Sequence, residues 1–195
     1  MPFDGESLGE LPRGEPLEVQ LNAVGTGTVW YTMTMQYSLP GEILPARDEG
    51  LALTRRVLRL DHREQGGSEQ GWRELQHGVT YRMEVSLAAA RGWQQVVLDA
   101  PIPSGARILD ARLQSTGTYA EPEGERPPPA VRQDYPGHAR FTFEALPPGV
   151  TTVHFLFRTV NRGIYPLPSA SARVVHEPEV FGRTAGVLAV IGDGP

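Results

Sequence analysis

The sequence predicts an all-β fold, an antiparallel β-sandwich, and three observations favour it. Apolar residues alternate with polar ones over several short runs, which is the spacing of strands that bury one face. The 22 Gly and 18 Pro residues divide these runs, as expected of strands joined by turns and not of a helical bundle. From residue 50 onward the spacing of turns makes room for about seven or eight strands, a pattern typical of an immunoglobulin- or fibronectin-like sandwich.

Two strands are predicted ahead of this main run, and a turn separates them from it. Leu17, Val19 and Leu21 form a short alternation, and the longest alternation in the chain covers 29–37. Pro40 and Gly41 then break the pattern. Two strands alone are only marginally stable. We therefore expect the chain to divide here, with one part at 1–38 and the main β-sandwich domain at 39–195.

In the main part, strands are predicted over 51–61, 79–87 and 93–100, around 141–143, and over 153–157 and 170–174. The first of them is the least regular. Its alternation slips at Arg55 and Arg56, which a β-bulge would explain, with a helix as the alternative. Residues 106–113 fit a strand or one short helix. The Pro-rich stretch 117–137 is expected to be a long exposed excursion, and 177–184 an extended tail.

The sequence shows none of the residue patterns that mark known catalytic or metal sites. It contains no cysteine, which excludes disulfides, thiolate zinc sites and a cysteine nucleophile. The five histidines lack HExxH spacing, and no glycine-rich phosphate loop opens a helix. The net charge of −5 argues against a nucleic-acid partner. We expect no enzymatic activity, no cofactor and no metal.

No part of the sequence is predicted to enter a membrane. There is no apolar run of the roughly 18 residues that a spanning helix needs. The N-terminus has neither a basic start nor an apolar centre, so it is not expected to be a signal peptide. If the protein is exported, the export signal must belong to a longer parent.

An ordered series of short motifs resembles the C-terminal region of bacterial alpha-2-macroglobulin-like proteins. The series covers nearly the whole chain, and its order and spacing are more specific than any single motif. Its pieces are GTVWY at 27–31, PARDEGL at 45–51, the strand 75–87 after a glycine turn, LPPG at 146–149, LPSA at 167–170 and EPEVFGRT at 177–184. The resemblance implies that 1–38 are the last strands of a preceding, CUB-like β module. It also implies that 39–195 form the final macroglobulin-like β-sandwich domain.

The resemblance further implies a setting and a role. Proteins of this family are large periplasmic protease inhibitors, often lipid-anchored, in which a thioester of a helical domain acylates the trapped protease. The implied partners of this chain are that helical domain and the CUB-like module, and proteases only through the full-length protein. In the family a bulky pair before a Pro-Glu-x-x-Gly stretch shields the thioester. The matching residues here are Val175 and His176, where Met and Tyr would be expected.

Two other functions remain open from the sequence. The first is a generic periplasmic or cell-surface adhesion or interaction module, because one sandwich fold serves many functions. The second is a carbohydrate-binding or hydrolase accessory domain, which would need an exposed aromatic platform. Trp30, Trp72 and Trp93 are the candidates for that platform, and each can equally belong to the core or to a strand edge.

Overall fold

The computed structural model describes residues 22, 24–28, 30, 32, 44–60, 68–109 and 130–193. The chain forms two units, Met1–Tyr37 and Ser38–Pro195, of which the second carries the fold. The strands predicted over 17–21 and 29–37 lie outside the described residues, apart from residues 30 and 32. The assignment of 1–38 to a preceding β module therefore stays a prediction.

The described part of the second unit is built of strands, and it contains no helix that could cross a membrane. The prediction of an all-β fold is confirmed. The strands, in chain order, are β1 (Arg47–Glu49), β2 (Leu51–Arg59), β3 (Ser68–Gln70), β4 (Leu75–Gln76), β5 (Thr80–Ala89), β6 (Trp93–Pro101), β7 (Ala106–Leu109), β8 (Ala130–Tyr135), β9 (His138–Leu146), β10 (Gly149–Thr159), β11 (Gly163–Leu167), β12 (Ser171–Val174), β13 (Phe181–Arg183) and β14 (Val187–Gly192).

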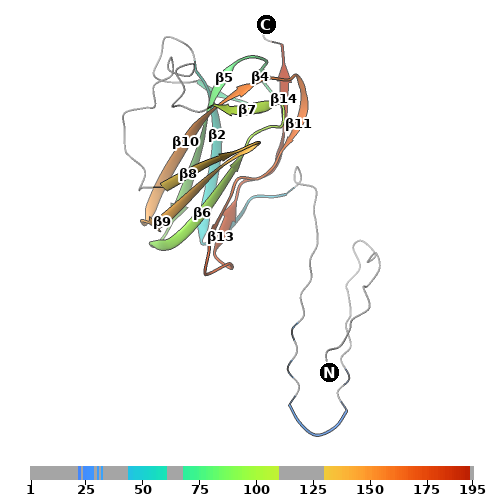
Figure 1. The fold of residues 1–195 in the computed structure, drawn as a ribbon, viewed down its shortest axis with the longest axis vertical. Helices are drawn as coiled ribbons and strands as arrows, with labels where there is room; N and C mark the ends of the chain where they lie inside the picture. The colour runs from blue at the N-terminus through green and yellow to red at the C-terminus, as the bar shows by residue number, and fades with distance from the viewer. Residues whose placement is uncertain are drawn as a thin grey trace. The chain divides into compact units, whose positions relative to one another are not determined.

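Two large antiparallel sheets face each other and enclose the core. One has the strand order β1-β13-β12-β6-β9-β8 and the other β3-β2-β5-β10-β7; in Figure 1, β8 and β9 cross the strands of the second sheet. The ring centroids of Phe141 on β9 and Phe155 on β10 lie 6.2 Å apart, so the inner faces of the two sheets are in contact. This is the packing of a β-sandwich.

A third, smaller sheet closes one end of the sandwich. Its order is β11-β14-β4, with β11 antiparallel and β4 parallel to β14. Figure 1 places these strands together at the upper end of the domain. Leu167, Ala189 and Ile191 from this sheet are buried in the same core as the two large sheets.

Strand β2 corrects the prediction of a bulge or helix at Arg55 and Arg56. Its register against β5 is continuous from Leu51 opposite Ala89 to Arg59 opposite Tyr81. The alternation does not slip, because Arg55 itself occupies a position on the inner face of the sheet. The irregularity in the sequence comes from a charged residue on the buried side, not from an extra residue in the strand.

Two further segments differ from the sequence prediction, and a third decides between two predicted alternatives. Residues 130–135, placed inside the exposed excursion of 117–137, form β8 along β9; residues 110–129 lie outside the described part. The expected extended tail, 177–184, turns at 177–180 and then forms β13 between β12 and β1. Residues 106–109 form a strand and not a short helix.

Candidate functional site

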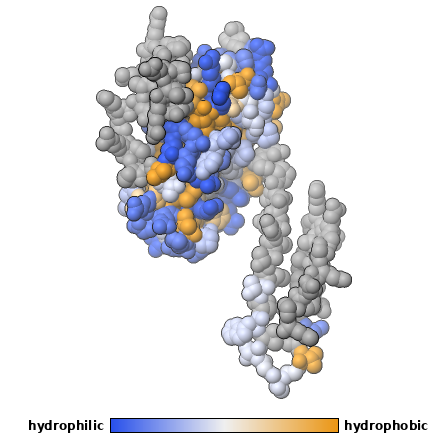
Figure 2. All heavy atoms as spheres, in the orientation of Figure 1, coloured by the Kyte–Doolittle hydropathy of each residue, from blue (hydrophilic) through white to orange (hydrophobic). Residues whose placement is uncertain are grey.

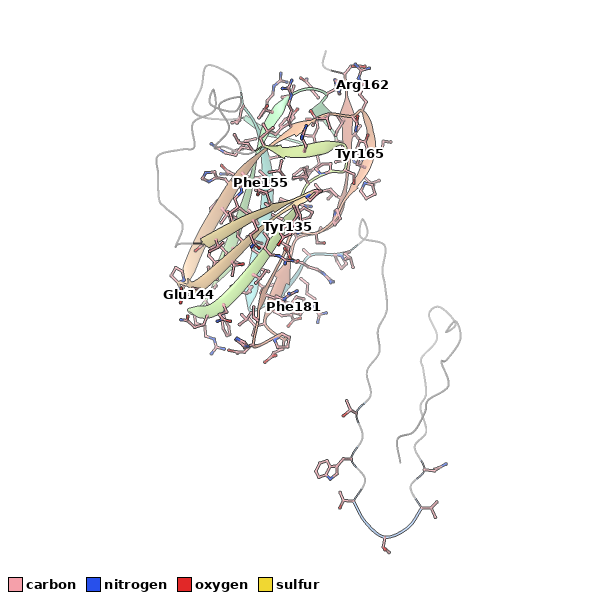
Figure 3. All side chains as sticks on the ribbon, in the orientation of Figure 1. Tyr135, Glu144, Phe155, Arg162, Tyr165 and Phe181 are labelled. Carbon is pink, nitrogen blue, oxygen red and sulfur yellow. The ribbon has the colours of Figure 1, made fainter. Side chains whose placement is uncertain are left out.

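The turn that begins at Val175 and His176 connects β12 to β13. Two backbone hydrogen bonds fix its shape: Val174 N donates to Val180 O at 3.0 Å, and Val180 N donates to Glu177 O at 2.9 Å. The Val175 side chain is 44% exposed, and His176 is also exposed. The two residues named from the sequence are therefore both on the surface, in the turn that leads to Phe181 at the start of β13; Phe181 is labelled in Figure 3.

Gln95 on β6 holds both residues in place. Its carbonyl oxygen accepts a hydrogen bond from Val175 N at 3.0 Å, and its side-chain Oε1 lies 2.9 Å from His176 Nε2. Since an amide oxygen only accepts, the imidazole N–H is the donor in this pair. Gln95 has a φ of 52°, a left-handed conformation that is rare outside glycine and costs roughly 1–3 kcal/mol.

Sequence reasoning missed Gln95, although the strand carried a signal. Gln94 and Gln95 are two successive exposed residues between the buried Trp93 and Val96, so the strict alternation breaks there. That break indicates a local irregularity. It does not indicate which residues lie opposite, because β12 joins β6 only through a pairing of distant segments, such as Val174 with Val96.

A guanidinium group borders the same site. Arg91 lies 4.0 Å from the centroid of the Trp93 ring, a cation–π distance. Its Nη2 atom is 3.9 Å from Glu177 Oε2, and both side chains are largely exposed, so this ion pair adds little stability. The indole Nε1 of Trp93 is buried without a hydrogen-bond partner. The site thus presents a half-exposed Val side chain framed by an imidazole–amide pair and a cation.

This arrangement is suited to contact and does not resemble a reaction centre. The His176 imidazole is hydrogen-bonded to an amide, which neither activates it as a base nor orients it toward a nucleophile. Within 44–60, 68–109 and 130–193 no group of three or more His, Asp and Glu side chains could hold a metal ion. The turn thus presents one half-exposed apolar side chain beside hydrogen-bonding groups.

The tryptophan platform required by a carbohydrate-binding function does not form in the second unit. Trp93 is 7% exposed and belongs to the core. Trp72 is partly buried and lies under the Arg55 guanidinium, 5.1 Å from its ring centroid. Trp30, which is exposed, belongs to the first unit. Neither tryptophan of the second unit therefore offers an exposed ring as a binding platform.

Comparison with known proteins identifies the fold and its family. Residues 50–179, about two thirds of the chain, match the family model of the bacterial alpha-2-macroglobulin MG10 domain. The chain belongs to this family. The matched range ends within the turn that holds Val175 and His176. The resemblance inferred from the ordered motifs is confirmed.

Relatives of this MG10 domain are much longer proteins. An alpha-2-macroglobulin homolog from Nostoc sp. is 27% identical over 190 residues, which are 94% of this chain and 10% of the relative. Salmonella alpha-2-macroglobulin reacted with methylamine superposes with a TM-score of 0.61 at 14% identity, covering 78% of this chain and 10% of that one. The native Escherichia coli protein from domain MG7 to the C-terminus gives 0.63 at 13% identity, covering 77% and 25%. The solved structures establish a shared fold.

Proposed function

We propose that this MG10 domain is a non-catalytic part of a longer alpha-2-macroglobulin-like protease inhibitor of the periplasm. In that protein Val175 and His176 contact a neighbouring helical domain and cover its thioester. One observation carries the proposal. The two side chains at the position inferred from the family are exposed, and Gln95 is hydrogen-bonded to the Val175 backbone and to the His176 side chain.

Exposure combined with rigidity is what a cover requires. A thioester keeps its reactivity only while water and amines are excluded, so the covering side chains must be available to a partner and already ordered. Burying the exposed part of the Val175 side chain would stabilise the contact by about 1 kcal/mol. The Gln95 hydrogen bonds lower the entropy lost when the turn is ordered against a partner.

Solved structures of the related proteins support the same proposed function. The Salmonella protein was crystallised after reaction with methylamine, a small amine. Escherichia coli alpha-2-macroglobulin was crystallised after activation by trypsin, and its structure was also determined after activation by porcine elastase. Amine reactivity and protease activation belong to those proteins, and we extend them to the parent of this domain as part of the proposal.

A protease-capture assay on the full-length parent tests this function. Trypsin is incubated with the parent, and the products are separated on a denaturing gel. We expect a covalent trypsin–parent band that disappears when the parent is first treated with methylamine. A parent that forms no such band and does not inhibit trypsin would contradict the proposal and favour an interaction module.

The proposed location is tested separately. We expect the parent's sequence to begin with an export signal, and the parent itself to fractionate with periplasmic or inner-membrane material. Recovery with cytoplasmic markers alone would contradict the proposed location. It would not affect the protease assay, which tests the function independently.

A further inference from the structure

The outward face of the antiparallel strand pair β11–β14 is apolar throughout. Ile164, Pro166, Leu188 and Val190 share this face, because Ile164 pairs with Val190 and Pro166 with Leu188 across the two strands. Ile164 is 68% and Leu188 40% exposed. The alternate residues of both strands point into the core. Figure 2 shows apolar atoms at the edge of the domain where Figure 1 draws β11 and β14.

This face, here called the β11–β14 face (Ile164, Pro166, Leu188 and Val190), differs from the outer faces of the other sheets. Neither β11 nor β14 contains a charged residue. The six-stranded sheet carries an outward Arg140–Asp99 pair at 2.7 Å, and on the outer face of the five-stranded sheet Arg56 pairs with the largely buried Glu84 at 2.6 Å. An apolar patch of a few hundred Å², the size of the largest patch on a typical monomer, is often functional.

We infer that the β11–β14 face is a second interdomain surface, which packs against an apolar, uncharged face of another domain of the same polypeptide. The inference rests on the proposed membership of this chain in a longer protein. It concerns a part of the domain distinct from the turn at Val175, since β11 and β13 lie at opposite ends of the domain in Figure 1.

The size of the patch favours a tethered partner over a second copy of the chain. Four partly exposed side chains offer on the order of 300 Å², whereas a stable complex between separate proteins buries about 800 Å² on each partner. A neighbour in the same chain is held at millimolar effective concentration, so a smaller contact suffices. The relatives provide such neighbours, because this chain covers only 10% of the Nostoc protein.

The edge strand β11 favours docking on the face and disfavours the addition of another strand. In the described sheet β11 pairs with β14 alone. Pro166 lacks the N–H group that an added strand would need, a device by which natural edge strands resist pairing. Just before β11 and just after β14, Arg162 forms an ion pair with Asp193 at 2.6 Å, which gives the apolar face a charged boundary; Arg162 is labelled in Figure 3.

Thiol labelling tests this inference directly, because the chain has no cysteine of its own. Ile164→Cys and Leu188→Cys are made in the 195-residue chain and in the full-length parent. The rate of reaction with a maleimide is then measured by peptide mass spectrometry. Val150→Cys is the matched control, since Val150 is 71% exposed and lies on β10 of another sheet.

We expect labelling at positions 164 and 188 to be roughly tenfold slower in the parent than in the 195-residue chain, the factor for a face covered nine-tenths of the time. The control should react alike in both. Equal rates in both proteins at 164 and 188 would overturn the inference. So would slower labelling that appears in the 195-residue chain as its concentration rises, since the occupant would then be a second copy.

Val175→Cys separates this result from that of the proposed function. Protection at position 175 without protection at 164 and 188 would refute the contact at the β11–β14 face and leave the shielding proposal standing. Protection at 164 and 188 without protection at 175 would refute the shielding proposal and leave the second interdomain contact standing. Free reaction at all three positions in the parent would refute both.

Discussion

At the scale of single residues, Arg55 shows how a charge is accommodated on the inner face of a sheet. Its Nη1 donates to Pro168 O at 2.6 Å and its Nη2 to Ala185 O at 3.1 Å. The guanidinium also lies over the Trp72 ring. Burial lowers the pKa of Arg55 to about 10. This one side chain thus ties β2 to the segments that flank the β12–β13 hairpin.

Replacing Arg55 should therefore destabilise the fold. Arg55→Ala leaves two carbonyl oxygens without their donor and removes the ring contact, for which we expect a loss of about 2–4 kcal/mol of unfolding free energy. Urea denaturation measures it, with Arg173→Ala as the control because Arg173 is exposed on β12. Equal losses in the two variants would show that Arg55 is not such a tie.

Tyr81 gives the fold a predictable response to alkali. Its ring is fully buried and stacks on Phe157 at 5.6 Å, and its hydroxyl oxygen accepts a hydrogen bond from Gln76 N at 2.8 Å. Burial raises the pKa of Tyr81, more than the backbone hydrogen bond and the charge of Arg59 lower it. A raised pKa means that the folded state holds its proton more tightly than the unfolded state.

The contribution of Tyr81 to stability is thus complete below a pH of about 10 and is lost as the pH rises through the higher pKa of the folded state. We expect the unfolding free energy to fall between about pH 9 and pH 11, and to fall less steeply in Tyr81→Phe, which cannot ionise. Urea titrations at both pH values check this. Parallel curves for the two proteins would exclude Tyr81 as a source of the alkaline response.

At the scale of elements, β13 depends on a close approach that only glycine permits. A Cβ atom at Gly182 would collide with the carbonyl oxygen of Leu51 and with the Leu53 side chain on β2. The two large sheets therefore approach each other closely at this position. The strand has three residues, too few to show a period, which is why the sequence predicted only an extended tail here.

Adding one methyl group at this position should be costly. For Gly182→Ala we expect a loss of roughly 1–3 kcal/mol, the range for overpacking of a core, because backbone must move to admit the methyl group. Gly192→Ala is the matched control, as nothing lies within 4 Å of a Cβ built there. Thermal unfolding of both variants measures the difference. A melting temperature for Gly182→Ala equal to that of the control would show that the sheets can separate without cost.

The elements that the sequence predicted well are those with local alternation. Runs such as Val153, Phe155 and Phe157 are buried on one face as expected. Elements defined by distant partners were missed. Strand β4 has two residues and exists only through its parallel pairing with β14, and β8 forms because β9 lies beside it. Alternation reports which face of a strand is buried, and it carries no information on the neighbour.

At the scale of the whole molecule, part of the candidate site could be predicted from the sequence and part could not. Ordered motifs led to Val175 and His176, and the MG10 family model confirms the family. Gln95, which fixes both residues, could not be predicted, because it lies some 80 positions earlier in the chain and meets them only when β6 pairs with β12. The site is therefore a product of sheet topology as much as of the motif.

The rate at which methylamine inactivates the full-length parent tests most directly whether this turn covers a thioester. His176→Ala and Val175→Ala each open the cover. Losing about 1 kcal/mol of covering contact should raise the rate about fivefold. His77→Ala, an exposed histidine beside β4 in the third sheet, should leave the rate unchanged. An unchanged rate in both Val175→Ala and His176→Ala, or a parent that methylamine does not modify, would contradict the shielding role.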